Sequence, residues 1–533
     1  VEYLFTEILI CVIILWFKSK KRGRIMSQII IMAAILIYLA AMLGVGFYCS
    51  KQNNSVDDFY LGGRKLGPFV TAMSAEASDM SSWLLMGLPG VAYLSGVASA
   101  AWTAIGLAIG TYVNWLIVAR RIRVYSKAYE AFTVPDFFAK RFGDKKGILT
   151  GIAALMIIIF FIPYTASGFA ACGKLFSSLF GVNYMAAMVI SAAVIVGYCA
   201  LGGFLAASTT DLIQSIVMTI ALVVVVVFGI NVAGGLDVVI DNARQLPGYL
   251  DFFHSYSVET QSAEKYSFLS IASTMAWGLG YFGMPHILLR FMAIEDENKL
   301  KISRRVATVW VVISLTIGVF IGIVGYSMSK AGAIEVLTGS NSETIIVRVA
   351  HLLSTYGAIP AIIGGLILAG MLAATMSTAD SQLLAAASAV SQNLVKDCFH
   401  IKITEKMSIV VARITVVVIA VIGVFMASNP DSSVFDIVSF AWAGFGATFG
   451  PVVLVSLFWK GANRYGVLAG MVSGGVMIFL WKYVIAKLGG VFAIYELLPA
   501  FIVAVAVIVV VSLVTGGPEQ EVLEKFEQVK AQN

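Results

Sequence analysis

The sequence predicts an all-α membrane protein with thirteen membrane-spanning helices. Apolar residues make up 59% of the 533 residues and charged residues only 12%, whereas soluble domains carry roughly 25% charged residues. The apolar residues form runs of about twenty, the length that a helix needs to cross a bilayer. The predicted spans are 28–48, 68–92, 98–119, 148–172, 183–201, 207–233, 268–289, 306–329, 357–379, 408–428, 434–458, 465–486 and 493–515.

Lysine and arginine are concentrated in alternate loops between these spans. The largest group, Arg120 to Lys146, lies between the third and fourth spans, and the intervening loops carry few basic residues. Because basic loops are retained on the cytoplasmic side, we expect a multi-pass protein of the cell membrane with its N-terminus outside and its C-terminus in the cytoplasm. An odd number of spans satisfies this orientation.

One integral membrane domain is predicted for residues 26–515, because no Pro/Ser/Gly-rich linker divides them. Residues 516–533 form a short charged tail, and 234–267 is expected to be a polar connecting loop. Residues 1–25 contain an apolar stretch shorter than a full span and then a basic run. We interpret them as an upstream extension and assign them no function.

Two of the predicted spans contain residues that interrupt a regular helix. The second carries the polar stretch Ala77 to Trp83, and the seventh carries three glycines and a proline between Trp277 and Pro285, which weaken a helix. In transporters built from inverted repeats, helices break at matching positions, where freed carbonyls bind ions. Because the two interrupted spans are five apart, we expect spans 2–6 and 7–11 to form two repeats.

Asp79 lies inside the second span, where an ionised side chain costs about 2.5–3.5 kcal/mol on insertion scales and therefore indicates a functional site. Serines flank it at 78, 81 and 82, and hard cations such as sodium prefer several oxygen ligands. A buried ion pair is the alternative, but this span has no basic residue. The pattern favours a cation site at Asp79.

A second oxygen-rich patch lies in and just after the ninth span. Ser377, Asp380 and Ser381 share one helix face, and Thr378 adjoins it. Hydroxyl residues alone would indicate helix packing, but the acid favours an ion path. Asp211 opens the sixth span, where an N-cap and an ion relay both remain open.

Aromatic residues lie in or beside the interruptions. Trp83, Trp277 and Tyr281 flank the two breaks, and Tyr164 follows Pro163 in the fourth span. Aromatic walls suit a small apolar ring with a polar head, but aromatic residues also form interfacial belts. The pattern alone leaves both interpretations open.

The chain closely resembles the sodium/solute symporter family, and in particular its proline-transporting bacterial members, from about residue 26 to 515. The segments that carry the resemblance are Leu61 to Arg64, Ala77 to Ser81, Trp83 to Gly90, Gly202 to Leu205, Trp277 to Pro285 and Met376 to Thr378. It implies thirteen helices with a LeuT-type five-plus-five inverted-repeat core. It also implies sodium-coupled transport of L-proline.

The resemblance also implies roles for individual residues. The expected sodium ligands are the backbone oxygens of Ala77, Met80 and Ala374 and the hydroxyls of Ser377 and Thr378. The expected proline contacts are Ser81, Trp83, Tyr164, Trp277, Tyr281 and Pro285. Arg64 and Asp79 match positions that matter for sodium coupling in the family.

The chain departs from the family at three positions. Glu76 and Ser82 stand where small glycine-like residues are expected, which puts affinity and ion preference in doubt, and we assign Glu76 no firm role. Asp380 replaces a hydroxyl, and together with Asp211 it is predicted to form a second cation site.

We therefore predict alternating-access symport of sodium and L-proline through a lipid bilayer, with no enzymatic activity and no nucleic-acid partner. A carrier for another small metabolite is the main alternative. A membrane sensor would require a signalling domain, whereas only some eighteen residues follow the last span. A membrane enzyme would require a nucleophile–base pair or a metal set, and of the histidines only His286 lies within a span.

Overall fold

The computed structural model describes residues 25–48, 61–202 and 204–531, so the predicted extension at 1–25 lies almost wholly outside the described residues. Within them, ten helices are long and apolar enough to cross a membrane. They are Ile25–Tyr48, Val97–Ala128 (α5, Val97–Val113; η3, Asn114–Val118; α6, Ala119–Ala128), α8 (Ile148–Phe180), α10 (Phe204–Val232), Glu297–Lys330 (η5, Glu297–Lys299; α14, Leu300–Lys330), Ala358–Cys398 (α16, Ala358–Ser388; η7, Ala389–Cys398), α17 (Glu405–Met426), α18 (Val434–Phe458), Arg464–Leu488 (α19, Arg464–Leu480; η8, Trp481–Ile485; η9, Ala486–Leu488) and α20 (Leu497–Val514).

The three remaining predicted spans are not long continuous helices. Span 183–201 corresponds to α9 (Tyr184–Gly202), whose described apolar part is shorter than a full span. Spans 68–92 and 268–289 are each divided into segments. The protein is thus a multi-pass helical membrane protein, and the count of thirteen spans stays a prediction.

Both predicted interruptions are confirmed. The first lies between α3 (Pro68–Ala77) and the π-helical turn η2 (Trp83–Gly87), which leads into α4 (Leu88–Ser95). Ser78 to Ser82 form irregular turns, in which the Asp79 and Met80 amides both donate to Glu76 O. The carbonyls that follow are therefore released from regular helical hydrogen bonding.

The second interruption separates α12 (Phe268–Met275) from α13 (Pro285–Ala293). Between them lie the 3₁₀ segment η4 (Ala276–Gly283) and the extended residue Met284. Pro285 has no backbone N–H and begins α13. Gly278 permits close packing of η4 on α5, because a Cβ there would lie 2.2 Å from Gly106 O.

Smaller elements connect the long helices. They are η1 (Gly62–Arg64), α7 (Val134–Phe142), α11 (Leu236–Arg244), the antiparallel pair β1 (His254–Ser257) and β2 (Ser262–Lys265), η6 (Gly339–Thr344), α15 (Ile345–Ser354), η10 (Gly490–Phe492) and α21 (Gln520–Ala531). The expected polar loop at 234–267 is thus partly folded, and most of the charged tail is helical.

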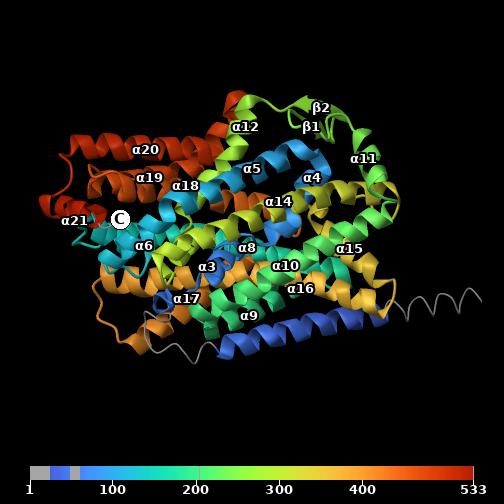
Figure 1. Ribbon diagram of the computed structural model, residues 1–533, viewed down its shortest axis with the longest axis horizontal. Helices are drawn as coiled ribbons and strands as arrows, with labels where there is room; N and C mark the ends of the chain where they lie inside the picture. Colours follow the sequence, from blue (N-terminus) through green and yellow to red (C-terminus); the bar gives the residue numbers. More distant parts are fainter. Residues whose placement is uncertain (1–24, 49–60, 203, 532–533) are drawn as a thin grey trace, which may run out of the picture.

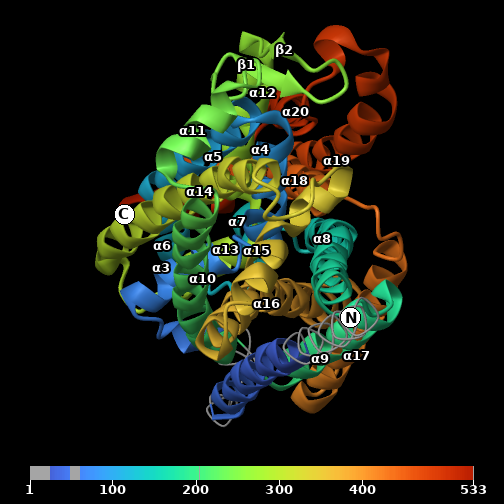
Figure 2. The same cartoon turned by 90° about the vertical axis from the view of Figure 1, so that its right-hand side faces the viewer.

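The long helices run roughly along the long axis of the molecule (Figure 1). The β1–β2 hairpin and α11 lie near one end, and α6 and α21 lie near the other. Figure 2 looks along this axis and shows α8, α16 and α18 between the pair α19–α20 and the group of α9, α17 and the first helix. The two broken segments pack among these helices, so their interruptions are buried within the protein.

Candidate functional site

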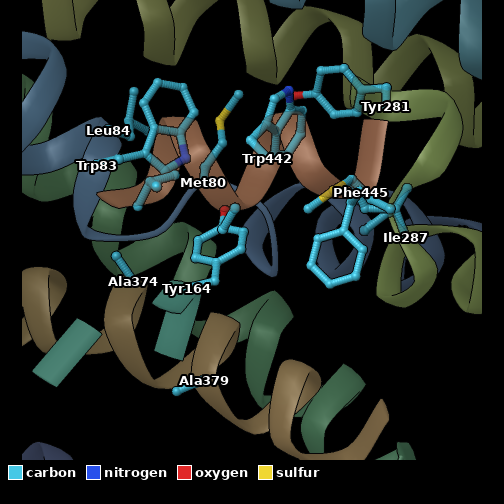
Figure 3. Packing of buried hydrophobic residues seen from close by; sticks show 14 of the residues in the cluster. Met80, Trp83, Leu84, Tyr164, Tyr281, Ile287, Ala374, Ala379, Trp442 and Phe445 are labelled. Atoms are coloured by element: carbon cyan, nitrogen blue, oxygen red, sulfur yellow. The ribbon is translucent and has the colours of Figure 1, made fainter. Parts of the chain in front are cut away.

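The break after α3 meets the middle of α16. Ser377 Oγ lies within hydrogen-bond distance of two acceptors, Ala77 O (2.7 Å) and Ala374 O (3.1 Å), and Thr378 Oγ1 donates to Ala374 O (3.1 Å). Met80 is also buried and lies above Tyr164 and Ala374 in the view of Figure 3. The structure therefore brings four of the five predicted sodium ligands into one hydrogen-bonded group of oxygens.

Asp79 connects this break to three of the predicted aromatic residues. Its carbonyl oxygen accepts hydrogen bonds from Trp83 Nε1 (3.0 Å) and from Tyr164 Oη (3.2 Å). Its carboxylate atom Oδ2 accepts one from Tyr281 Oη (2.6 Å). Asp79 is fully buried, and the structure brings these four predicted residues together.

The rings form a continuous buried wall. Trp277 lies 5.9 Å from Trp83 and 6.2 Å from Trp442, measured between ring centroids, and Tyr281 meets Trp442 edge-on at 5.0 Å. Trp442 Nε1 also donates to Trp277 O at 2.7 Å. Figure 3 shows Trp83, Trp442 and Tyr281 along the same row. Trp442 was not predicted, because nothing in its apolar span marks it out.

A small cavity lies between α8, α16 and Ser81 of the break after α3. Its lining includes the predicted residues Ser81, Tyr164 and Thr378, together with Thr375 and Gln382, which were not predicted. Its volume of about 10 Å³ is close to the space that one water molecule needs. Binding of a larger molecule therefore requires these elements to separate. Pro285 is buried at the start of α13, beyond η4.

Asp211 and Asp380 belong to a separate buried network. Arg290 Nη2 lies 3.2 Å from Asp211 Oδ2 and donates to Ser381 Oγ at 2.5 Å. Ser381 Oγ in turn donates to Asp380 Oδ1 at 3.1 Å, and Ser74 Oγ donates to Asp211 Oδ2 at 2.6 Å. A guanidinium group thus already lies beside Asp211 and Ser381, and Arg290 is a second residue that the sequence analysis missed.

Arg64 lies apart from the oxygens at the break. Its guanidinium donates to Met292 O and Ala131 O, each at 2.7 Å, and to Ser126 Oγ at 3.2 Å. It therefore ties the segment before α3 to the end of α13 and to the connection after α6. A parallel bridge between Leu66 and Ile294 joins the same two segments.

The arrangement suits a monovalent cation better than a transition metal. Among the described residues there is no group of three or more His, Cys, Asp or Glu side chains that could hold a metal ion. The converging atoms are carbonyl and hydroxyl oxygens, which hard cations prefer. Broken helices that offer such oxygens in the protein interior are typical of ion-coupled carriers.

This fold and site define a secondary transporter. The Sodium:solute symporter family model matches residues 59–474, and the chain belongs to this family. It is 41% identical to the osmoregulated proline transporter OpuE of Bacillus subtilis over 92% of this chain and 95% of that protein. It is 40% identical to the sodium/proline symporter of Salmonella typhimurium over 93% and 95% of the two chains.

A solved structure shares the fold. The substrate-bound, outward-open Na⁺-coupled sialic acid symporter superposes with a TM-score of 0.74 and covers 92% of this chain and 99% of its own. Its sequence identity is 17%, so this similarity concerns the fold alone.

Proposed function

We propose that the protein carries L-proline into the cell together with sodium. One observation carries the proposal: four oxygens, connected by hydrogen-bond distances, lie together beside the buried aromatic wall. They are Ala77 O, Ala374 O and the hydroxyls of Ser377 and Thr378. The names of the two proline-transporting relatives support the choice of substrate. Sodium is a transported substrate here, not a resident cofactor.

In this proposal, sodium binds between the break after α3 and α16. Its ligands are the backbone oxygens of Ala77, Met80 and Ala374 and the hydroxyls of Ser377 and Thr378. The two hydroxyls now donate to Ala77 O and Ala374 O. On binding sodium they rotate so that their lone pairs face the ion, which replaces those hydrogen bonds with contacts to a cation.

Proline binds in the enlarged form of the small cavity. Trp83, Tyr164, Trp277 and Tyr281 enclose its ring, Ser81 hydrogen-bonds its polar head, and Pro285 fixes the far edge of the pocket. Because Asp79 O accepts from Trp83 and Tyr164, an ion that orders the break also orders two walls of the proline pocket. This shared residue gives sodium a way to raise the affinity for proline.

Four other residues complete the coupling. The Asp79 carboxylate accepts the hydrogen bond of the Tyr281 hydroxyl and so connects the two breaks. Arg64 donates to Met292 O at the end of α13, so the segment before α3 and α13 move together. Asp211 and Asp380 form a second cation path. Because the Arg290 guanidinium already lies beside Asp211, a cation passes here only during transport and none is bound at rest.

Transport proceeds by alternating access in a LeuT-type core of two inverted five-helix repeats with thirteen spans in all. The hairpin end faces outward, the α21 end faces the cytoplasm, and the N-terminus lies outside. The inward sodium gradient and the membrane potential, which supplies about 2.3 kcal/mol per charge per 100 mV, drive accumulation.

Uptake of labelled proline into proteoliposomes tests this function. We expect an inward sodium gradient to drive accumulation that collapses when potassium replaces sodium. Excess unlabelled proline should compete, and a panel of other small metabolites should not. Sodium-driven uptake of another metabolite in preference to proline would overturn the substrate assignment, and proline uptake without sodium dependence would overturn the coupling.

A further inference from the structure

Glu76 is an unusual residue for the last turn of α3. Its side chain is 1% exposed, and Oε1 accepts a hydrogen bond from Trp115 Nε1 at 2.7 Å. The second carboxylate oxygen, Oε2, has no hydrogen-bond partner among the described residues. Half of a buried carboxylate is therefore unsatisfied, which is costly because it has lost its water.

Asp79 lies one turn further on and is in the same condition. Tyr281 donates to its Oδ2, but Oδ1 has no hydrogen-bond partner within the described part of the chain. Glu76 interacts electrostatically with both the Asp79 carboxylate and the Tyr281 phenol. The two acids thus share one buried region, and no ion pair of the described residues includes either of them.

A neutral oxygen from a neighbouring helix segment is also buried and, among the residues that the structure describes, unpaired. Asn114, 1% exposed, lies at the start of η3, next to Trp115. Its Nδ2 donates to Tyr281 O at 3.0 Å, which fixes the amide orientation, and Oδ1 is left without a hydrogen-bond partner in the described residues. One turn earlier, the buried Thr111 Oγ1 is likewise without a hydrogen-bond partner in the described part of the chain. Asn114 is not acidic, so its unsatisfied oxygen is evidence independent of the two carboxylates.

These atoms have the composition of a site for a hard monovalent cation. Two carboxylates, an amide oxygen and a hydroxyl are the ligand types that such an ion prefers. Two neighbouring carboxylates with one neutral donor each and no basic partner are poorly stabilised in a buried site. A bound cation compensates their charge and satisfies the oxygens that the protein leaves unpaired.

We propose that Glu76, Asp79 and Asn114 form an additional sodium site between the end of α3 and η3, with Thr111 as a neighbouring ligand. It lies on the α5–η3 side of the break, whereas the sodium position of the proposed function lies on the α16 side. The inference rests on the proposed function in that it makes the protein a carrier with two sodium sites. Glu76, which departs from the glycine-like residue expected at this position, provides its second carboxylate.

The test is a count of bound sodium. Binding of ²²Na⁺ to the purified full-length protein is measured by equilibrium dialysis without proline. We expect two ions per wild-type chain. Glu76→Gln keeps the size of the side chain and an acceptor for Trp115 but removes the charge, so it should bind one ion. Ser377→Ala should also bind one, and the double variant none. The matched control, Asp436→Asn, neutralises an exposed carboxylate outside the site and should bind two.

The wild-type count keeps the inference falsifiable if Glu76→Gln is not monodisperse in size-exclusion chromatography. One ion per wild-type chain, or release of a proton in place of a second sodium, overturns it, and so does a folded Glu76→Gln that still binds two. Proline uptake by the same wild-type preparation separates the two proposals. Sodium-driven uptake with a single bound ion overturns only the additional site, whereas two bound ions without sodium-driven proline uptake overturn the proposed function.

Discussion

At the scale of single residues, Ser377 links the break after α3 to α16. Its hydroxyl contacts one carbonyl of α3 and one of its own helix, so it joins the two elements that the proposed sodium ion would join. Removal of the Ser377 hydroxyl should therefore weaken sodium binding more than proline binding.

We predict that Ser377→Ala raises the sodium concentration for half-maximal proline uptake roughly tenfold or more, the size of one lost interaction with a charged group. The reason is the loss of one oxygen ligand without a change in backbone. Proteoliposome uptake over a sodium series measures it. Ser388→Ala is the control and should leave the sodium dependence within twofold. Ser388 is on the same helix, but within the described residues its hydroxyl bonds only to Ala385 O. A similar shift in both variants would contradict the assigned role.

Tyr281 makes a distinct contribution, because its hydroxyl is the donor to the Asp79 carboxylate at 2.6 Å. Tyr281→Phe retains the ring against Trp442 and removes only this hydrogen bond. We expect roughly ten- to hundredfold weaker sodium activation, since a hydrogen bond to a charged group contributes about 1.5–3 kcal/mol.

Tyr326→Phe is the comparison for this variant, because Tyr326 is a half-buried tyrosine outside the site. Sodium-activated uptake by the two variants measures the difference. Unchanged activation of Tyr281→Phe would mean that the Asp79 carboxylate does not depend on this donor.

At the scale of elements, η4 relies on glycine to fit against α18. A Cβ at Gly280 would lie 1.9 Å from Trp442 Nε1, whereas a Cβ at Gly197 of α9 would meet no atom within 4 Å. The interruption is therefore held open by close packing as well as by a proline.

Gly280→Ala should displace Trp442, break its hydrogen bond to Trp277 O, and destabilise the protein by about 1–3 kcal/mol, as overpacking does. Thermal unfolding in detergent, together with proline uptake, measures both effects. Gly197→Ala is the matched control and should behave as wild type. If Gly280→Ala had a normal unfolding temperature and normal uptake, η4 would be able to accommodate a Cβ at this position, and the close packing against Trp442 would not be required.

The elements also show which features the sequence could predict. The interruptions at Ala77 to Trp83 and Trp277 to Pro285 were predictable because glycine, proline and clustered hydroxyls act locally. The end of α16 was not: the predicted span stops at 379, but the helix continues to Ser388, because its polar residues are buried by neighbouring helices.

The residues of the candidate site also fall into those with a local sequence signal and those that depend on tertiary contacts. Ser377, Thr378 and Asp79 were predicted from their chemistry and from the family resemblance. Arg290 and Trp442 were missed because their importance arises from contacts 79 and 165 residues away in sequence, with Asp211 and Trp277 respectively. Such contacts depend on tertiary packing, which no local pattern encodes.

At the scale of the whole molecule, the two ends are closed by different kinds of contact. Near the hairpin end, Lys174 Nζ lies 2.7 Å from Glu343 Oε2, and both side chains are buried. Glu343 also accepts hydrogen bonds from Ser433 Oγ and from the amides of Val434 and Phe435 at the start of α18. A buried pair with this many donors resists separation, because removing one partner leaves a desolvated charge.

The opposite end is covered by α21, which is held by one aromatic anchor and several exposed ion pairs. The Phe526 ring lies 4.2 Å from the Arg141 guanidinium carbon and 5.7 Å from the Tyr125 ring. Burial lowers the pKa of Arg141 to about 10, so this side chain stays charged at neutral pH and retains its cation–π contact. The pairs Lys145–Glu521 and Lys460–Glu527 are solvent-exposed.

We therefore predict that α21 depends on Phe526 and not on its salt bridges. Phe526→Ala should raise hydrogen exchange across 520–531 at least tenfold, because the buried ring is the main contact that fixes this helix to α6 and α7. Glu527→Gln should change exchange by less than about fivefold, since an exposed ion pair contributes about 0–1 kcal/mol. Hydrogen exchange followed by mass spectrometry measures both variants. The opposite order, with Glu527→Gln releasing the helix and Phe526→Ala leaving it protected, would mean that charge holds this end of the protein closed and that its closure weakens with ionic strength.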